Sequence, residues 1–270
     1  MDKFASSTLE EEIGEYWDER AESYSNGVRG ELSDNRRDAW QCALERALLG
    51  QILEAALEDR APRAIDLGCG PGFFSILLAE MGCRVDAVDA SHEMLERARS
   101  NALAMGVGDR ITFHQADVTM LGFDDGAFDI VVNRNLMWLM RNPEAAYIEW
   151  LRILRPGGKL MVFDANWYLY LVDDDINARR HADQDGRCVE EWGEDARATT
   201  AEERRCERIA AELPLTPVVR PGWDLDVLSR LGAKHVSADE GAWLDLWTES
   251  EKRFYATSPM FMVEAVAGAA

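Results

Sequence analysis

Apolar side chains recur every three or four residues over the first 60 positions of the chain, and this spacing predicts two amphipathic helices. The first helix is expected over residues 9–25 and ends at the turn-forming pair Asn26 and Gly27. The second is expected over residues 36–59, and Pro62 then closes the segment. The chain therefore begins with a helical lead-in that precedes the rest of the pattern.

From residue 63 onward, short apolar runs alternate with helical periodicity. The runs predict strands at residues 63–67, 84–88, 110–114, 128–132 and 159–163. Helices are expected between them at residues 72–81, 92–105 and 143–154, with a tight turn at 155–158. Ser91 and Asn142 stand where the N-caps of two of these helices should be. Strands and helices that alternate in this way form right-handed βαβ units and a parallel sheet.

This alternation stops after residue 163 and resumes near residue 223. Between Asp173 and Glu212 the chain has 13 acidic residues and 7 arginines but few large apolar ones, which indicates a partly helical insertion lying over the sheet. A helix at residues 223–231 and strands at 233–237 and 260–266 follow, whereas residues 243–251 are expected to be an exposed helix or loop.

These elements predict one α/β domain over residues 1–270, with seven strands in a mostly parallel sheet and an antiparallel last strand. Ligands bind at the carboxyl edge of such sheets, so the lead-in and the insertion are expected to cover that edge as a lid and a substrate cap. The expected parts are an N-terminal helical lid (1–60), a core (61–165), the insertion (166–220) and a C-terminal helix with strands (221–270).

Composition and charge narrow the class of protein. The hydrophobic content of 47% supports a core. The sequence has no apolar run of 18 residues and no apolar leader, so we expect no membrane span and no signal peptide. The net charge of −21 argues against nucleic acid as the main partner. The five cysteines show no CxxC spacing, which predicts reduced thiols, a cytoplasmic location and no metal site; Cys188 and Cys206 lack further ligands around them.

The stretch IDLGCGPGFF, residues 65–74, is a glycine-rich turn after a strand, which lets backbone approach a ligand closely. A nucleoside triphosphate loop is excluded because no Lys-Ser or Lys-Thr follows the glycines. The dinucleotide pattern GxGxxG fails at Phe73, where its third glycine should stand. Asp89 ends the second strand 21 residues after Gly68, a spacing that suits a carboxylate accepting ribose hydroxyls in NAD and in other adenosine ligands alike.

Three further stretches distinguish among adenosine ligands. HQADV places Asp117 after the third strand, where it could accept from an adenine amino group. FDIVVNRNLMW places Asn133 and Arg134 at the end of the fourth strand, and LRILRPGGKLMVFD joins a helix to the fifth strand through a tight turn. With these motifs, residues 9–166 resemble the class I, Rossmann-like S-adenosylmethionine-dependent methyltransferases of the small-molecule type.

The resemblance implies a cofactor site. The first motif, Asp66, Gly68 and Gly70, would lie beside the methionine part of the cofactor, with Cys69 at a variable position, and Asp89 would hold the ribose. Ala90 and Met94 after the second strand, and Asp117 and Val118 after the third, would contact the adenine. The backbone of Asn133, at the end of the fourth strand, would face the sulfonium, and Tyr16 and Tyr24 would belong to the lid. Carboxylates and aromatic faces suit a cofactor that is a cation and has no phosphate.

The expected reaction is in-line displacement of the cofactor methyl group by a small-molecule acceptor. The sulfonium is already an activated leaving group, so the enzyme would mainly supply orientation and desolvation. A dedicated base is unnecessary if the nucleophile is an amine that is deprotonated on binding, and the sequence leaves the use of a general base open. Trp167 and Tyr168 follow the fifth strand and either line the acceptor pocket or pack in the core. The acidic insertion suits a cationic or amine-bearing acceptor, unless its acids simply face solvent. The alternatives are a non-catalytic cofactor-binding module and an NAD-dependent oxidoreductase.

Overall fold

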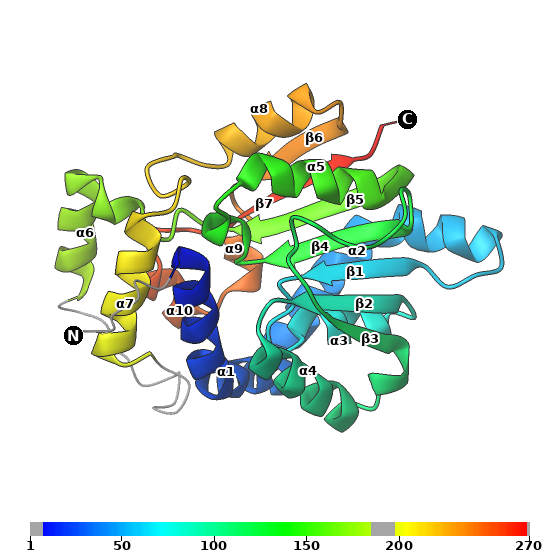
Figure 1. The fold of residues 1–270 in the computed structure, drawn as a ribbon, viewed down its shortest axis with the longest axis horizontal. Coiled ribbons are helices and arrows are strands. Elements are labelled where there is room, and N and C mark those ends of the chain that lie inside the picture. The colour runs from blue at the N-terminus through cyan, green and yellow to red at the C-terminus, as the bar shows by residue number, and fades with distance from the viewer. Residues whose placement is uncertain (1–7, 185–197, 269–270) are drawn as a thin grey trace, which may run out of the picture.

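The computed structural model describes residues 8–184 and 198–268, with the backbone alone for residues 181–184 (Figure 1). Its centre is a seven-stranded sheet with the order β3-β2-β1-β4-β5-β7-β6. The strands are β1 (Arg63–Leu67), β2 (Arg84–Asp89), β3 (Ile111–Gln115), β4 (Phe128–Arg134), β5 (Leu154–Asp164), β6 (Lys234–Asp239) and β7 (Phe261–Val266).

The strand directions confirm the predicted mostly parallel sheet. β1 to β5 pair in parallel, and β7 runs antiparallel to both of its neighbours, β5 and β6. The strand order reverses where β1 lies between β2 and β4, and ligands of open α/β sheets bind at the carboxyl ends of the strands at such a switch point.

Helices bury both faces of this sheet, and alternate residues of β4 show how. Two clusters of buried hydrophobic residues lie on opposite faces of the sheet. Val132 belongs to the cluster with Leu44 and Ile76, whereas the neighbouring Val131 belongs to the cluster with Trp150 and Leu228. The helices that supply these two clusters are α2 (Asn35–Leu57), α3 (Phe73–Glu80) and α4 (His92–Ala104) on the first face, and α5 (Pro143–Ile153) and α8 (Gly222–Arg230) on the second.

Helix α1 (Leu9–Ser33) is longer than the sequence predicted, because it does not stop at Asn26 and Gly27. Its buried positions continue through Val28 and Leu32 at helical spacing, and this packing outweighs a glycine cost of about 1 kcal/mol. The break falls instead at Asp34, whose extended backbone ends α1 and whose carboxylate accepts from the Arg36 amide at 2.8 Å to cap α2.

The region after β5 is partly helical, as expected. It contains η3 (Leu169–Leu171), α6 (Asp174–Gln184) and α7 (Thr200–Ala211). Helix α7 lies beside the first half of α1 (Figure 1), where Arg205 donates to Glu19 at 2.8 Å and Ile209 packs near Tyr16. The insertion and the lead-in therefore contact each other at the carboxyl edge of the sheet.

Two local predictions are wrong. Residues 155–158 are not a separate turn but part of β5, where the register against β4 shifts between Phe128 and Ile130. Residues 243–251 are not simply exposed: they form α9 (Trp243–Leu246) and the start of α10 (Glu249–Phe254), with Leu246 and Glu251 buried. Among the helices of the described residues, none has the length and apolar character needed to cross a membrane.

Candidate cofactor and acceptor site

The glycine turn joins β1 to α3 through left-handed backbone at Gly68, Gly70 and Gly72, with φ angles of 63°, 50° and 90°. Only glycine adopts this geometry without strain. A Cβ on Gly68 would come within 2.6 Å of Leu136, so the segment after β4 lies directly against the turn. The ends of β1 and β4 thus form one continuous surface.

Asp89 ends β2 beside this turn and fixes it. Its Oδ2 accepts from the Gly70 amide at 2.8 Å, and its Oδ1 accepts from the Ser91 amide at 2.9 Å. Burial raises the pKa of this carboxyl, although these backbone donors oppose the rise. Each carboxylate oxygen can accept a second hydrogen bond, so Asp89 could also accept from the ribose hydroxyls, as predicted, while it holds the two amides.

Asp66 is fully buried in β1 and caps the next helix. Its Oδ2 accepts from the amide of Ser75 at 2.8 Å and from its hydroxyl at 2.6 Å. These two bonds give Asp66 a structural role. Oδ1 has no hydrogen-bond partner among the described residues, so it is the atom that could meet the methionine part of a cofactor.

Replacing Asp66 with asparagine is expected to remove a pH dependence of stability. Burial raises the pKa of Asp66 to about 6, so between pH 4 and 6 the folded state binds more protons than the unfolded state. The Asp66 contribution therefore falls by about 3 kcal/mol as the pH rises through this window. Urea unfolding at pH 5 and pH 7.5 should show a smaller loss for Asp66→Asn than for the wild type; equal losses would contradict the assignment.

The predicted adenine-side residues gather at the neighbouring ends of β2 and β3. Met94 is buried and its amide donates to Ser91 Oγ at 3.0 Å, while the Ala90 carbonyl accepts from Gln115 at 3.0 Å. Val118 is buried and its carbonyl accepts from Trp150 at 2.9 Å. Together these contacts fix the backbone around the predicted adenine position.

Asp117 lies beside them and is exposed. Its Oδ1 accepts from both the amide and the hydroxyl of Thr119, each at 2.8 Å, which is a local turn bond. Its second oxygen has no partner among the described residues. The prediction that Asp117 accepts from the adenine amino group therefore depends on that oxygen.

The side-chain amide of Asn133, near the end of β4, is buried without a hydrogen-bond partner among the described residues. The side chain is 0% exposed, and neither its Oδ1 nor its Nδ2 has a hydrogen-bond partner. A buried polar group without a partner is costly and uncommon, so a ligand that meets this amide would recover free energy. The sequence placed Asn133 in the site through its backbone; the structure adds the side chain.

Helix α1 holds the predicted lid tyrosines over the glycine turn. Ser91 donates to Asp18 at 2.5 Å and Arg97 donates to Glu22 at 2.7 Å, which ties α1 to α4. The ring of Tyr24 lies 3.8 Å from the point where a Cβ on Gly70 would be. Tyr24 therefore stands directly above the turn.

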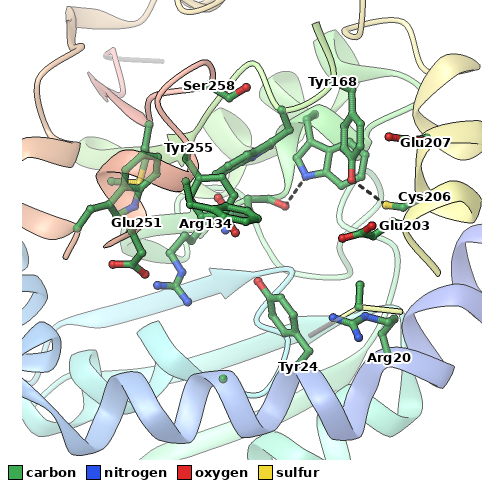
Figure 2. A pocket seen from close by; sticks show the side chains of 18 of the residues that line it. Arg20, Tyr24, Arg134, Tyr168, Glu203, Cys206, Glu207, Glu251, Tyr255 and Ser258 are labelled. Atoms are coloured by element: carbon green, nitrogen blue, oxygen red, sulfur yellow. Dashed lines mark hydrogen bonds between the residues drawn. The ribbon is translucent and has the colours of Figure 1, made fainter. Parts of the chain in front are cut away.

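A cavity of about 340 Å³ lies on the other side of Tyr24 (Figure 2). Tyr16 and Tyr24 line it from α1, and Trp167 and Tyr168 line it after β5, so the predicted substrate residues do face a pocket. The remaining aromatic lining residues were not predicted: Trp17, Trp40, Trp138, Tyr170, Trp247, Phe254 and Tyr255. The glycine turn and Asp89 do not line this cavity, so the predicted site consists of two adjoining parts that meet at Tyr24.

The cavity is lined by charges of both signs. Figure 2 shows Arg134 and Glu251 at one side and Glu203, Glu207 and Arg20 at the other. Glu31 and Arg180 also line the cavity, so three arginines and four glutamates are among its described lining residues. The carboxylate-rich pocket expected from the insertion is therefore a mixed one.

Two phenols and the thiol of the cavity have raised pKa values. The hydroxyl oxygen of Tyr168 and Sγ of Cys206 lie 2.9 Å apart and form a hydrogen bond. Burial raises the pKa of Tyr16, Tyr168 and Cys206 above their ordinary values. These groups remain protonated at neutral pH and do not serve as a general base there. Within the described residues no group of His, Cys, Asp and Glu side chains could hold a metal; Cys188 lies outside them.

A buried ion cluster behind the cavity orients two of its walls. Asp164, at the end of β5, accepts from the Trp138 amide through Oδ2 and from the Trp167 indole through Oδ1, both at 2.9 Å. Arg220 donates to Asp164 at 2.6 Å and forms two bonds to Asp224, at 2.7 and 2.9 Å. No sequence motif marks Arg220, because its partners come together only in the folded chain.

The comparisons with known proteins agree with this geometry. The family model described as "Methyltransferase domain" matches residues 65–162. Methyltransferase GfsG of Streptomyces halstedii is 28% identical over 261 residues, which cover 87% of this chain and 89% of that protein. The tRNA 5-carboxymethoxyuridine methyltransferase of Escherichia coli is 29% identical over a segment that covers 57% of this chain and 58% of that protein. The phosphatidylethanolamine N-methyltransferase of Cereibacter sphaeroides is 34% identical over 40% of this chain and 53% of that protein.

Two solved structures share the fold. Geranyl diphosphate C-methyltransferase of Streptomyces coelicolor, in complex with S-adenosyl-L-homocysteine, is 15% identical with a TM-score of 0.54 and coverage of 97% of this chain and 99% of that one. The [4+2]-cyclase SpnF is 19% identical with the same TM-score of 0.54 and coverage of 96% of each chain. Residues 65–162 match a methyltransferase domain, and the comparisons support the predicted class, the class I S-adenosylmethionine-dependent methyltransferases.

The residues present fit the S-adenosylmethionine cofactor of this class. The unpartnered amide of Asn133 and the left-handed turn at Gly70 are features that a ligand would explain. Asp89 and Asp117 are placed at neighbouring strand ends with acceptor capacity to spare.

Proposed function

We propose that the protein methylates a small molecule bound in the aromatic cavity. The observation that carries this proposal is the position of the cavity, which adjoins the glycine turn at Tyr24 and is bounded by the lid and the insertion. A volume of about 340 Å³ suits a compact acceptor. The insertion would then act as the substrate cap, and the free thiols of Cys42, Cys69, Cys83 and Cys206 fit the proposed cytoplasmic location.

In this proposal the protein supplies orientation and exclusion of water. Bound S-adenosylmethionine would supply an activated methyl group. Asp89 and Asn133 would hold the cofactor through its ribose and its methionine end, respectively. Trp138 and Trp167, which Asp164 fixes, would position the acceptor, and α1 would close the site from water.

The cavity favours a flat or aromatic acceptor with polar ends. Trp167, Trp247 and Tyr255 pack with ring centroids 5.2 to 6.3 Å apart along one wall, and Tyr16, Trp17 and Tyr24 form a ladder on α1 at 5.1 and 5.6 Å. Such rings stack on planar ligands. The net charge of −21 disfavours an RNA acceptor, because phosphates need clustered basic residues.

A screen with labelled S-adenosylmethionine tests the proposal across aromatic amines, phenols, aromatic acids, aliphatic amines and total RNA. We expect transfer to a small aromatic acceptor. Trp167→Ala should raise the KM for that acceptor about tenfold, because a large ring contact is lost. Preferred methylation of RNA would contradict the acceptor class. Cofactor binding without transfer to any acceptor would favour the non-catalytic module, and binding of NAD in its place would favour the oxidoreductase.

A further inference from the structure

Arg134 is an arginine held inside the cavity wall by aromatic rings. It is the last residue of β4, and its guanidinium lies 4.3 Å from the ring centroid of Phe73, 5.3 Å from that of Trp40 and 5.7 Å from that of Phe74. Its side chain is 13% exposed. Stacking on these rings fixes the plane of the guanidinium, so little conformational entropy would be lost when the group binds a ligand.

Most of the hydrogen-bonding capacity of Arg134 is unused. Nη1 donates to Glu31 Oε2 at 2.7 Å. Nε and Nη2 have no hydrogen-bond partner among the described residues. Neither of these two nitrogens is fully buried, so both are accessible to a ligand. The other nearby carboxylate, Glu251, is already occupied by Arg36 at 3.1 Å and by the Thr248 amide at 2.7 Å.

A planar guanidinium with free donors in a water-accessible cavity matches a carboxylate, which it binds through two parallel hydrogen bonds. Glu31 belongs to α1, which also carries Tyr24, and makes one such bond from the lid side of the cavity. A ligand carboxylate that bound through the free Nε and Nη2 would share the guanidinium with Glu31, and the two carboxylates would repel each other.

We propose that Arg134 is the carboxylate-binding residue of this cavity and that Glu31 on the lid weakens the binding of a ligand carboxylate at the same guanidinium. The proposal rests on the proposed function, because it concerns the same cavity. Two sources share this chemistry. One is the amino-acid end of the cofactor, since β4 adjoins β1 and the glycine turn. The other is a carboxylate on the methyl acceptor.

The cofactor arm of the test compares S-adenosylhomocysteine with methylthioadenosine, which lacks the amino-acid end. Calorimetry is carried out on the wild type, Arg134→Gln and Glu31→Gln. If Arg134 holds the cofactor, Arg134→Gln should weaken S-adenosylhomocysteine about 10- to 150-fold, the range for hydrogen bonds to a charged group, and leave methylthioadenosine unchanged. Glu31→Gln should strengthen S-adenosylhomocysteine, because the competing carboxylate is gone.

The acceptor arm compares benzoate with benzyl alcohol in the presence of S-adenosylhomocysteine. If Arg134 holds the acceptor, Arg134→Gln should abolish a wild-type preference for benzoate, and Glu31→Gln should increase it. Arg134→Lys keeps the charge but not the planar pair of donors, so it should restore only part of the effect. Arg230→Gln is the matched control, since it removes an ion pair with Glu144 outside the cavity and away from the lid.

The proposal is overturned if Arg134→Gln binds both S-adenosylhomocysteine and benzoate as the wild type does. It is also overturned if Arg134→Gln weakens each ligand of a pair equally, or if Glu31→Gln weakens the carboxylate ligand. Failure of the wild type to bind S-adenosylhomocysteine would refute the proposed function instead, and the benzoate pair, measured without S-adenosylhomocysteine, would then decide the role of Arg134.

Discussion

Replacing Arg220 with methionine is expected to lower the free energy of unfolding by about 3–5 kcal/mol, the usual cost of leaving a buried charge without its partner. The side chains of Arg220, Asp164 and Asp224 are 0–1% exposed, and the arginine neutralises the two carboxylates. Burial raises the pKa of Asp164, while the charge of Arg220 opposes this rise. Without the arginine the two acids would have to bind protons or remain charged in the core.

Urea unfolding measures this loss. Because the unpaired acids bind protons more readily in the folded state, the deficit of Arg220→Met should be smaller at pH 5 than at pH 8. Arg230→Met is the matched control: its partner is Glu144, their side chains are 60% and 45% exposed, and its effect should stay below about 1 kcal/mol. Equal effects of the two substitutions would show that the cluster contributes no special stability.

Replacing Asp89 with alanine is expected to weaken S-adenosylhomocysteine binding by about 2–4 kcal/mol, or about 30- to 700-fold. Part of this loss is the predicted pair of charge-assisted bonds to the ribose. The other part comes from the protein, because the same carboxylate holds the Gly70 and Ser91 amides at 2.8 and 2.9 Å. Without it the glycine turn is no longer fixed before the ligand arrives.

Calorimetry with S-adenosylhomocysteine tests this expectation, with circular dichroism as a check on folding. Asp86→Asn provides the control, since it removes one negative charge from the same strand while its partners are His114 and Arg63, away from the turn. An Asp89→Ala variant that keeps wild-type affinity would remove this residue from the cofactor site.

The cavity explains why the acceptor was harder to predict than the cofactor. Cofactor residues follow individual strands, so their place along the chain already implies a common edge of the sheet. The aromatic cavity, in which we propose that the acceptor binds, is instead assembled from α1, the end of β4, the region after β5 and α10. Glu251 illustrates the difference: it was expected to be exposed, but it is buried against Arg36, 215 positions away in the chain.

The sequence by itself determined the sheet and the cofactor edge. Alternating apolar runs predicted all seven strands, and the glycine turn together with Asp89 indicated the ligand class, because these signals come from neighbours along the chain. Local signals failed at Asn26 and Gly27, where burial of Val28 and Leu32 outweighed a turn-forming pair.

Only the tertiary structure decided which side chains meet across long separations. It paired Arg134 with Glu31, 103 positions apart, and Arg220 with Asp164, 56 positions apart. It also left the Asn133 amide buried without a partner. The physical reason is that burial and ion pairing depend on the position of every packed element at once, whereas periodicity reports only which face of its own helix or strand a residue occupies.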